Sequence, residues 1–381
     1  MRSTALAITL LVVAQPALVA SHGVDTRTTV AAGDVHADST FARLVARLSE
    51  DGGYFDTENL ISNEASYLHV LGKLRAMGLQ GGAYVGVGPD QNFSYIAQLR
   101  PTVAFILDIR RENMLQHLLF KALFSLAHNR AEYLSLLLGR PLRGDVSTWR
   151  DRDIQQLVEY LDATSPDSGF VNRTRESLRR RLPGFGVPLS RLDLETIRHI
   201  HGSFIEEGLE LRFTSAGRPA RPYYPTLRQL FLEKDLTGKR GSYVANEDDF
   251  QFLKSLQERN LVVPVVGNFA GEHALAAIGK EIAARGERVT AFYTSNVEFY
   301  LMREGGFERF VENVRALPHD GRTVIVRSYF GGPYRVPHPQ AVDGYYSTQL
   351  LQPVDSLLAE HARGGFASYT DLVTKHSLEL R

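Results

Sequence analysis

The sequence predicts an α/β protein with a doubly wound, mostly parallel sheet that carries a helical insertion. Short, fully apolar runs alternate with helix-length amphipathic segments before residue 140 and again after residue 245. Such runs are typical of parallel strands that are covered by helices on both faces of a sheet. Apolar residues make up 44% of the 381 residues and charged residues 23%, which excludes a disordered or fibrous chain.

The charge balance and the residue types that are missing exclude several functions. Lys+Arg and Asp+Glu both number 43, so there is no excess positive charge for nucleic-acid binding and no nucleic-acid partner is expected. Because the chain contains no cysteine, it forms no disulfide, zinc–thiolate site or iron–sulfur cluster. The absence of a Gly-x-Ser-x-Gly elbow and of a P-loop argues against an α/β-hydrolase and a P-loop NTPase.

Residues 1–21 have the order of parts of a signal peptide. Arg2 precedes an apolar run from Ala5 to Ala14, and small residues follow up to Ser21. We therefore expect export to the periplasm or the medium; a buried N-terminal helix, and hence a cytoplasmic protein, is the alternative. The run is too short for a stable transmembrane span.

The α/β rhythm then divides the chain. Residues 22–38 are expected to be a linker, 39–139 the first half of the sheet domain, 140–245 the insertion or cap, 246–340 the second half, and 341–381 a C-terminal extension. In the first half we expect helices at 39–49, 64–77 and 93–99, one or two helices over 114–138, and strands at 83–85 and 103–107. Later helices are expected at 154–161, 173–182, 192–207, 248–258, 274–284 and 307–317, with strands at 261–266, 289–293 and 323–327.

A glycine-rich turn marks the predicted ligand site. Gly86 and Gly88 follow the first strand, a helix comes next, and Asp108 ends the second strand. Glycines let a backbone turn sharply against a ligand, the helix N-terminus offers free N–H groups, and the acid can bind ribose hydroxyls. Gln91 stands where a nicotinamide-binding fingerprint has its third glycine.

With these residues in place, the segment 80–110 resembles the class I S-adenosylmethionine-dependent methyltransferases, which have a Rossmann-like fold. The resemblance extends loosely to 246–330, and Tyr84 stands where that family has an acid. It implies S-adenosylmethionine or a related nucleoside as the ligand, bound by Gly86, Gly88 and Asp108. The chain is also similar to an uncharacterised bacterial family that carries NLISNE, VGVGPDQNFSYI and FILDIRREN.

Three further residues are expected to face the same site. Glu64 could replace the missing acid, although capping of a helix by this segment is an equal alternative. Asn268 and Asn296 follow later strands, whose carboxyl ends lie at the same edge of a parallel sheet. Turn and capping roles are the alternative for both.

The sequence thus predicts a nucleoside-binding protein with methyl transfer as the implied reaction. The alternatives are a non-catalytic exported binding or interaction module on a methyltransferase-like fold, and an enzyme that uses another nucleotide. Arg110 and Arg111 could hold an anion, and His199 with His201 has the spacing of a metal pair, but structural roles are favoured for all four. The catalytic residues, the methyl acceptor and the oligomeric state are left open.

Overall fold

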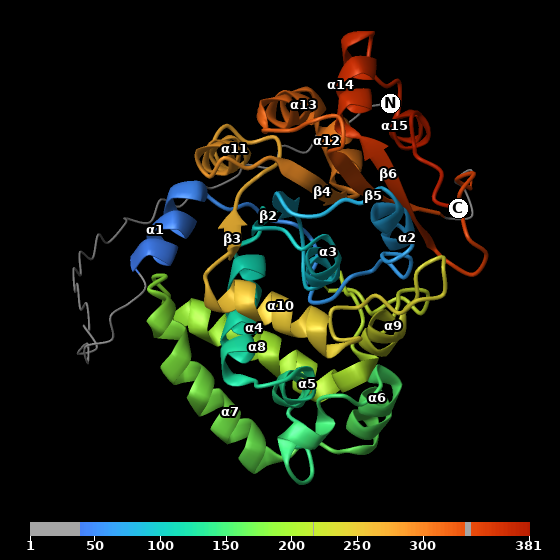
Figure 1. Cartoon of the computed structure of the whole chain (residues 1–381). Coiled ribbons are helices and arrows are strands. Elements are labelled where there is room, and N and C mark those ends of the chain that lie inside the picture. Colours follow the sequence, from blue (N-terminus) through green and yellow to red (C-terminus); the bar gives the residue numbers. More distant parts are fainter. Residues whose placement is uncertain (1–38, 216, 332–336) are drawn as a thin grey trace, which may run out of the picture. The chain divides into compact units, whose positions relative to one another are not determined.

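The computed structural model describes residues 39–215, 217–331 and 337–381 (Figure 1), so the predicted signal peptide and linker lie outside the described residues. Six strands form one sheet in the order β3-β2-β1-β4-β5-β6. They are β1 (Ala83–Gly86), β2 (Val103–Asp108), β3 (Val262–Val266), β4 (Val289–Ser295), β5 (Val324–Phe330) and β6 (Ser347–Pro353).

The sheet is mostly parallel, as the sequence predicts. Strands β1 to β5 pair in parallel, and β6 is antiparallel to β5. The chain builds outward from β1 through β2 to β3, then returns to place β4 on the other side of β1. The strand order therefore reverses between β1 and β4, which is where open α/β sheets bind ligands.

Fifteen α-helices lie within the described ranges. They are α1 (Ser39–Leu48), α2 (Leu71–Ala76), α3 (Gln91–Leu99), α4 (Arg111–Leu126), α5 (Arg130–Leu138), α6 (Ile154–Ala163), α7 (Ser168–Arg181), α8 (Arg191–Glu207), α9 (Leu227–Leu232), α10 (Glu247–Glu258), α11 (Ala274–Ala284), α12 (Val297–Glu304), α13 (Phe307–Ala316), α14 (Val354–Ala362) and α15 (Tyr369–Thr374). None of them is long and apolar enough to cross a membrane.

Helices cover both faces of the sheet. Figure 1 shows α11 and α13 on one side of the strands and α3 and α10 on the other. Right-handed crossovers require this change of face when the strand order reverses. Helices α5, α7 and α8 pack on α4, and α6 packs on α5, so α4 joins this helical region to the sheet.

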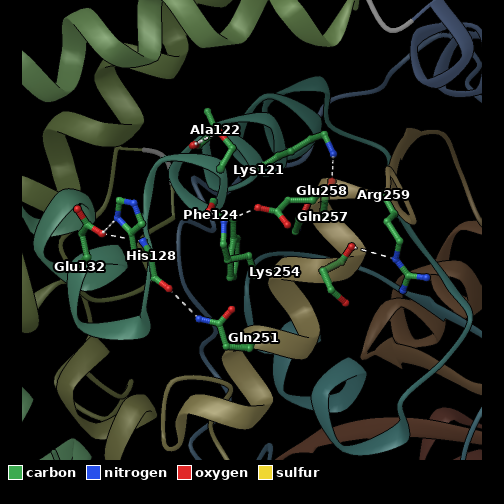
Figure 2. A network of polar contacts seen from close by, with 12 residues as sticks. Lys121, Ala122, Phe124, His128, Glu132, Gln251, Lys254, Gln257, Glu258 and Arg259 are labelled. Carbon is green, nitrogen blue, oxygen red and sulfur yellow. Dashed lines mark hydrogen bonds and ion pairs between the residues drawn. The ribbon is translucent and has the colours of Figure 1, made fainter. Parts of the chain in front are cut away.

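Helix α10 is fixed to α4 by polar contacts as well as by apolar packing (Figure 2). The ammonium group of Lys121 donates to the carbonyl of Gln257, and that of Lys254 donates to the carbonyl of Phe124 at 2.9 Å. The Gln251 amide donates to the carbonyl of His128 at 2.8 Å. These bonds satisfy carbonyls near the C-terminal ends of both helices, where intrahelical donors run out.

Several elements differ from the expectation, among them α9, α12, α14 and α15, which were not predicted. The helix predicted over 64–77 begins only at Leu71, because residues 65–70 form turns in which Ser66 bonds to the Ser347 hydroxyl at 2.8 Å. Strand β6 was not predicted at all. Its polar side chains, including Gln349 and Gln352, are buried against polar partners, so the strand lacks an apolar pattern.

Candidate functional site

A cavity of about 200 Å³ lies at the carboxyl ends of β1, β2, β3 and β4, at the reversal of the strand order. Its lining includes five of the six residues that the sequence selects, namely Glu64, Gly88, Asp108, Asn268 and Asn296. The sixth residue, Gly86, does not line it. Apolar side chains complete the wall, among them Phe55, Ile109, Phe213, Phe269 and Tyr300.

Gly86 serves packing beneath the turn. A Cβ atom at this position would overlap Asn92 Oδ1 and would crowd the Tyr84 ring. Asn92 accepts from the Tyr84 hydroxyl at 2.8 Å and donates to the carbonyls of Val87 and Pro89, also at 2.8 Å. Tyr84 therefore holds the asparagine that shapes the turn.

Gly88 needs the left-handed conformation, with φ at +83°, and it lines the cavity. Its carbonyl accepts from Nε2 of His117 at 2.9 Å. Burial lowers the pKa of His117 to about 4, so the neutral ring must carry its proton on Nε2 to make this bond. His117 therefore fixes one side of the turn, and the other side lines the cavity.

Asp108 is not a free carboxylate. Arg110 donates to it from Nε at 3.2 Å and from Nη2 at 3.0 Å, and both side chains are about 95% buried. The remaining nitrogen, Nη1, donates to the carbonyls of Thr57 and Glu58. A ribose contact at Asp108 must therefore use the lone pairs that Arg110 leaves open.

Glu64 lies deep in the cavity wall and is only 1% exposed. Its Oε1 accepts from the Ser295 hydroxyl at 2.5 Å. Its Oε2 accepts from the Tyr293 hydroxyl at 2.7 Å and from the Gln349 amide at 3.0 Å. The carboxylate is therefore held by three neutral donors, which come from β4 and β6.

The directions of these bonds form one consistent network. The Ser328 hydroxyl donates to Gln349 Oε1 at 2.7 Å, which turns the amide nitrogen toward Glu64 and the Tyr95 hydroxyl. Tyr95 in turn donates to the carbonyl of Tyr67 at 2.6 Å. Each of these donors therefore has an acceptor, and the chain of bonds holds the Gln349 amide nitrogen against Glu64.

Gln91 extends the network to the turn. Because the Tyr293 proton goes to Glu64, Tyr293 must accept from Gln91 Nε2, at 3.2 Å. The amide oxygen of Gln91 is then left buried with no partner among the described residues. Burial, and then the charge of Glu64, raises the pKa of Tyr293 well above 10, so its hydroxyl stays a donor.

Glu64 is unusual among the buried carboxylates. Eight Asp and Glu side chains are buried in the described part of the chain, and six of them form ion pairs with arginine. The pairs are Arg110–Asp108, Arg111–Asp193, Arg75–Asp235, Arg130–Glu247, Arg100–Asp249 and Arg327–Glu298. Only Glu64 and Asp90 lack such a partner among the described residues.

The two asparagines retain polar groups for a ligand. Asn268 accepts from the Ala270 amide at 2.9 Å, and no acceptor among the described residues binds its amide nitrogen. Asn296 has a single weak contact, 3.4 Å from the Ser295 hydroxyl. Ser295 itself has a φ of +54°, at an irregularity in the pairing of β4. Strained residues of this kind cluster at functional sites.

The other candidates have structural partners. Arg111 binds Asp193 at 2.8 Å, and His201 is buried with Nε2 3.0 Å from the carbonyl of Leu136. His199 is exposed and lies at the neighbouring groove. No group of three potential metal ligands occurs within the described residues. Sequence reasoning missed Tyr293 and Gln349, because a buried tyrosine or glutamine gives no local signal.

A family model matches residues 60–142 and 209–375, about two thirds of the chain, and its description is "Domain of unknown function (DUF7790)". The chain belongs to this family. No curated protein matches it.

The DUF7790 match includes all six strands and every residue of the cavity lining except Tyr54, Phe55, Thr57 and Asn59. It omits residues 143–208, which hold α6, α7 and α8. The family description assigns no activity, so the function must be argued from the site itself.

Proposed function

We propose that this protein binds S-adenosylmethionine, or a related nucleoside that carries an amino group, in the cavity at the ends of β1 to β4. The observation that carries the proposal is Glu64, a buried carboxylate that has no cationic partner among the described residues and lines that cavity. Methyl transfer is the reaction that this ligand would serve. The sheet order agrees with a Rossmann-like, doubly wound fold for β1 to β5.

The charge of the cavity selects among nucleotides. Arg110 is the only basic side chain in its described lining, and Asp108 occupies it. Glu64 and Glu304 leave the cavity with negative charge, and Glu304 lies at the exposed end of α12. A pyrophosphate would meet this charge without a free cation, whereas a sulfonium and an ammonium group are attracted to it.

The acceptors in the wall suit the amino group. Glu64 keeps open lone pairs beyond the three hydrogen bonds that it accepts. The Gln91 amide bonds to the same Tyr293 hydroxyl, and its oxygen has no partner among the described residues. An ammonium group supplies three donors. Apolar side chains such as Ile109 and Phe213 would flank the base, since they line the cavity beside Asp108. Positioning of this kind is the main catalytic need in methyl transfer.

The test is calorimetry on the purified chain with S-adenosylmethionine, S-adenosylhomocysteine, methylthioadenosine and NAD. We expect the first two to bind and NAD to fail. Methylthioadenosine, which lacks the amino acid, should bind more weakly by about 1.5–3 kcal/mol, the worth of a hydrogen bond to a charged group.

The variant Glu64→Gln should bring the affinity for S-adenosylhomocysteine down to that for methylthioadenosine. Glu247→Gln is the control, because Glu247 is also buried, at 7% exposed, but lies on α10 outside the cavity. Absence of binding by every adenosine ligand would refute the proposal and favour the non-catalytic interaction module. Binding that ignores Glu64→Gln would refute the assignment of the amino group.

A further inference from the structure

A second hollow adjoins the cavity. A groove of about 490 Å³ runs between residues 52–60, helix α4 and helix α8. Tyr54, Phe55, Thr57 and Arg110 line both the cavity and the groove. A ligand in the groove therefore lies next to a ligand in the cavity, separated from it by the Asp108–Arg110 pair.

The groove is acidic. Glu58 and Glu112 line it, both are exposed, and neither forms an ion pair among the described residues. The guanidinium of Arg110 does not neutralise them, because its donors are taken by Asp108 and by two backbone carbonyls. The negative charge of Glu58 also acts outside the groove. Burial first, and then the charge of Glu58, raises the pKa of nearby Glu207.

A buried acceptor points to a ligand independently of these acids. Gln116 is 2% exposed and lines the groove. Its nitrogen donates to the carbonyl of Leu60 at 2.6 Å, which fixes the orientation of the amide. No donor within the described part of the chain reaches its oxygen, which is left toward the groove. The oxygen is not among the fully enclosed atoms that lack a partner, so a donor from a ligand in the groove can reach it.

Aromatic rings and helix α8 complete the walls of the groove. Phe55 packs edge-on against Tyr300 with ring centroids 4.9 Å apart, and the Tyr54 side chain is exposed beside it. Cations are attracted to the faces of such rings. Thr196 and His199 come from α8, which lies outside the family match.

From this geometry we infer that the groove binds a small organic cation, a primary ammonium compound with an apolar body, as the second ligand of the site. The inference rests on the proposed function, because it assigns this cation as the partner of the nucleoside. Glu58 and Glu112 would attract the charge, Gln116 would accept a proton of the ammonium group, and the aromatic rings would contact the apolar body.

Three probes of nearly equal size test the charge: phenethylamine, 2-phenylethanol and 3-phenylpropionate. Their binding is measured by calorimetry at low salt, with and without S-adenosylhomocysteine. We expect phenethylamine to bind at least tenfold more tightly than the other two. Glu58→Gln and Glu112→Gln should each weaken it about three- to tenfold, as expected for exposed charges. The control Glu195→Gln removes an exposed carboxylate of α8 outside the groove and should change nothing.

The outcomes separate this inference from the proposed function. Equal binding of the three probes, or amine binding that ignores both groove variants, overturns the inference even if S-adenosylhomocysteine binds. Selective amine binding that both variants weaken supports the inference. A failure of S-adenosylhomocysteine alone refutes the nucleoside proposal, and with it the pairing of the two ligands, while the cation site stands on the probe data.

Discussion

Replacing Asp90 by Asn should stabilise this protein at neutral pH and remove part of its pH dependence. Asp90 lies in the glycine-rich turn and is 4% exposed. Burial raises its pKa from 3.8 to about 6, although a hydrogen bond from the Tyr243 hydroxyl at 3.0 Å opposes the shift. The carboxyl group is therefore more easily ionised in the unfolded chain than in the folded one.

The sign and the size of this change in the free energy of unfolding follow from the linkage between proton binding and folding. A folded pKa above the unfolded value contributes stability that is complete below pH 3.8 and is lost as the pH rises through 6. At 1.36 kcal/mol per unit, a shift of about two units corresponds to about 3 kcal/mol. Asn keeps the shape and an acceptor for Tyr243 but has no charge to desolvate. The variant should avoid most of this loss.

Buried histidines oppose Asp90 in the wild type. Burial lowers the pKa of His69, His117 and His201 to about 4 each. Their contribution is present above pH 6.5 and is lost as the pH falls through 4. Because the two effects overlap and have opposite signs, the wild-type curve alone does not isolate Asp90. The difference between variant and wild type does.

Urea unfolding between pH 4 and pH 7.5 measures that difference. Asp90→Asn should match the wild type near pH 4 and exceed its free energy of unfolding by about 2–3 kcal/mol at pH 7.5. The exposed Asp343→Asn is the control and should show no pH-dependent difference. A variant no more stable than the wild type at pH 7.5, or a difference that is constant with pH, would show that burial does not control this carboxyl group.

Three substitutions separate structural from ligand-binding roles. Gly88→Ala should cost about 1–2 kcal/mol of unfolding free energy, since φ is +83°, and should weaken S-adenosylhomocysteine binding; an unchanged affinity in calorimetry would place the ligand elsewhere. Gly86→Ala should destabilise more than Gly88→Ala in urea, because its Cβ overlaps Asn92; the reverse order would contradict the packing role. Glu298→Gln should cost about 3–5 kcal/mol by leaving Arg327 buried without its carboxylate, yet keep nucleoside affinity in the folded fraction; a selective loss of affinity would assign this pair to the site.

The parallel part of the sheet could be predicted because its strands are buried on both faces. Val103 to Asp108 is a continuous apolar run with an acid at its end, and β2 has these bounds. Strand β6 gives no such signal. Its buried glutamines are satisfied by Glu64, Tyr95 and Arg327, which are distant in the sequence, so its burial depends on tertiary partners.

The same distinction applies to the candidate site. Topology alone places the ends of parallel strands together, and this is why Asp108, Asn268 and Asn296 line one cavity. Topology does not specify how side chains bond to one another. The sequence motif does not indicate that Arg110 forms an ion pair with Asp108, or that a side chain at Gly86 would overlap Asn92. Whether the lining residues bind a nucleoside stays a prediction.

Glu64 and Asp90 show two ways in which a fold can retain a buried acid without an arginine. Asp90 has one hydroxyl donor and a pKa near 6, so protonation relieves much of the desolvation cost. Glu64 has three donors instead, and the tyrosine among them keeps its proton because its pKa is raised. Those three donors satisfy the oxygens of the buried Glu64 side chain. Asp90 is enclosed by Tyr243 and its neighbours, whereas Glu64 lines a cavity, so Glu64 is the buried acid that a cationic ligand can reach.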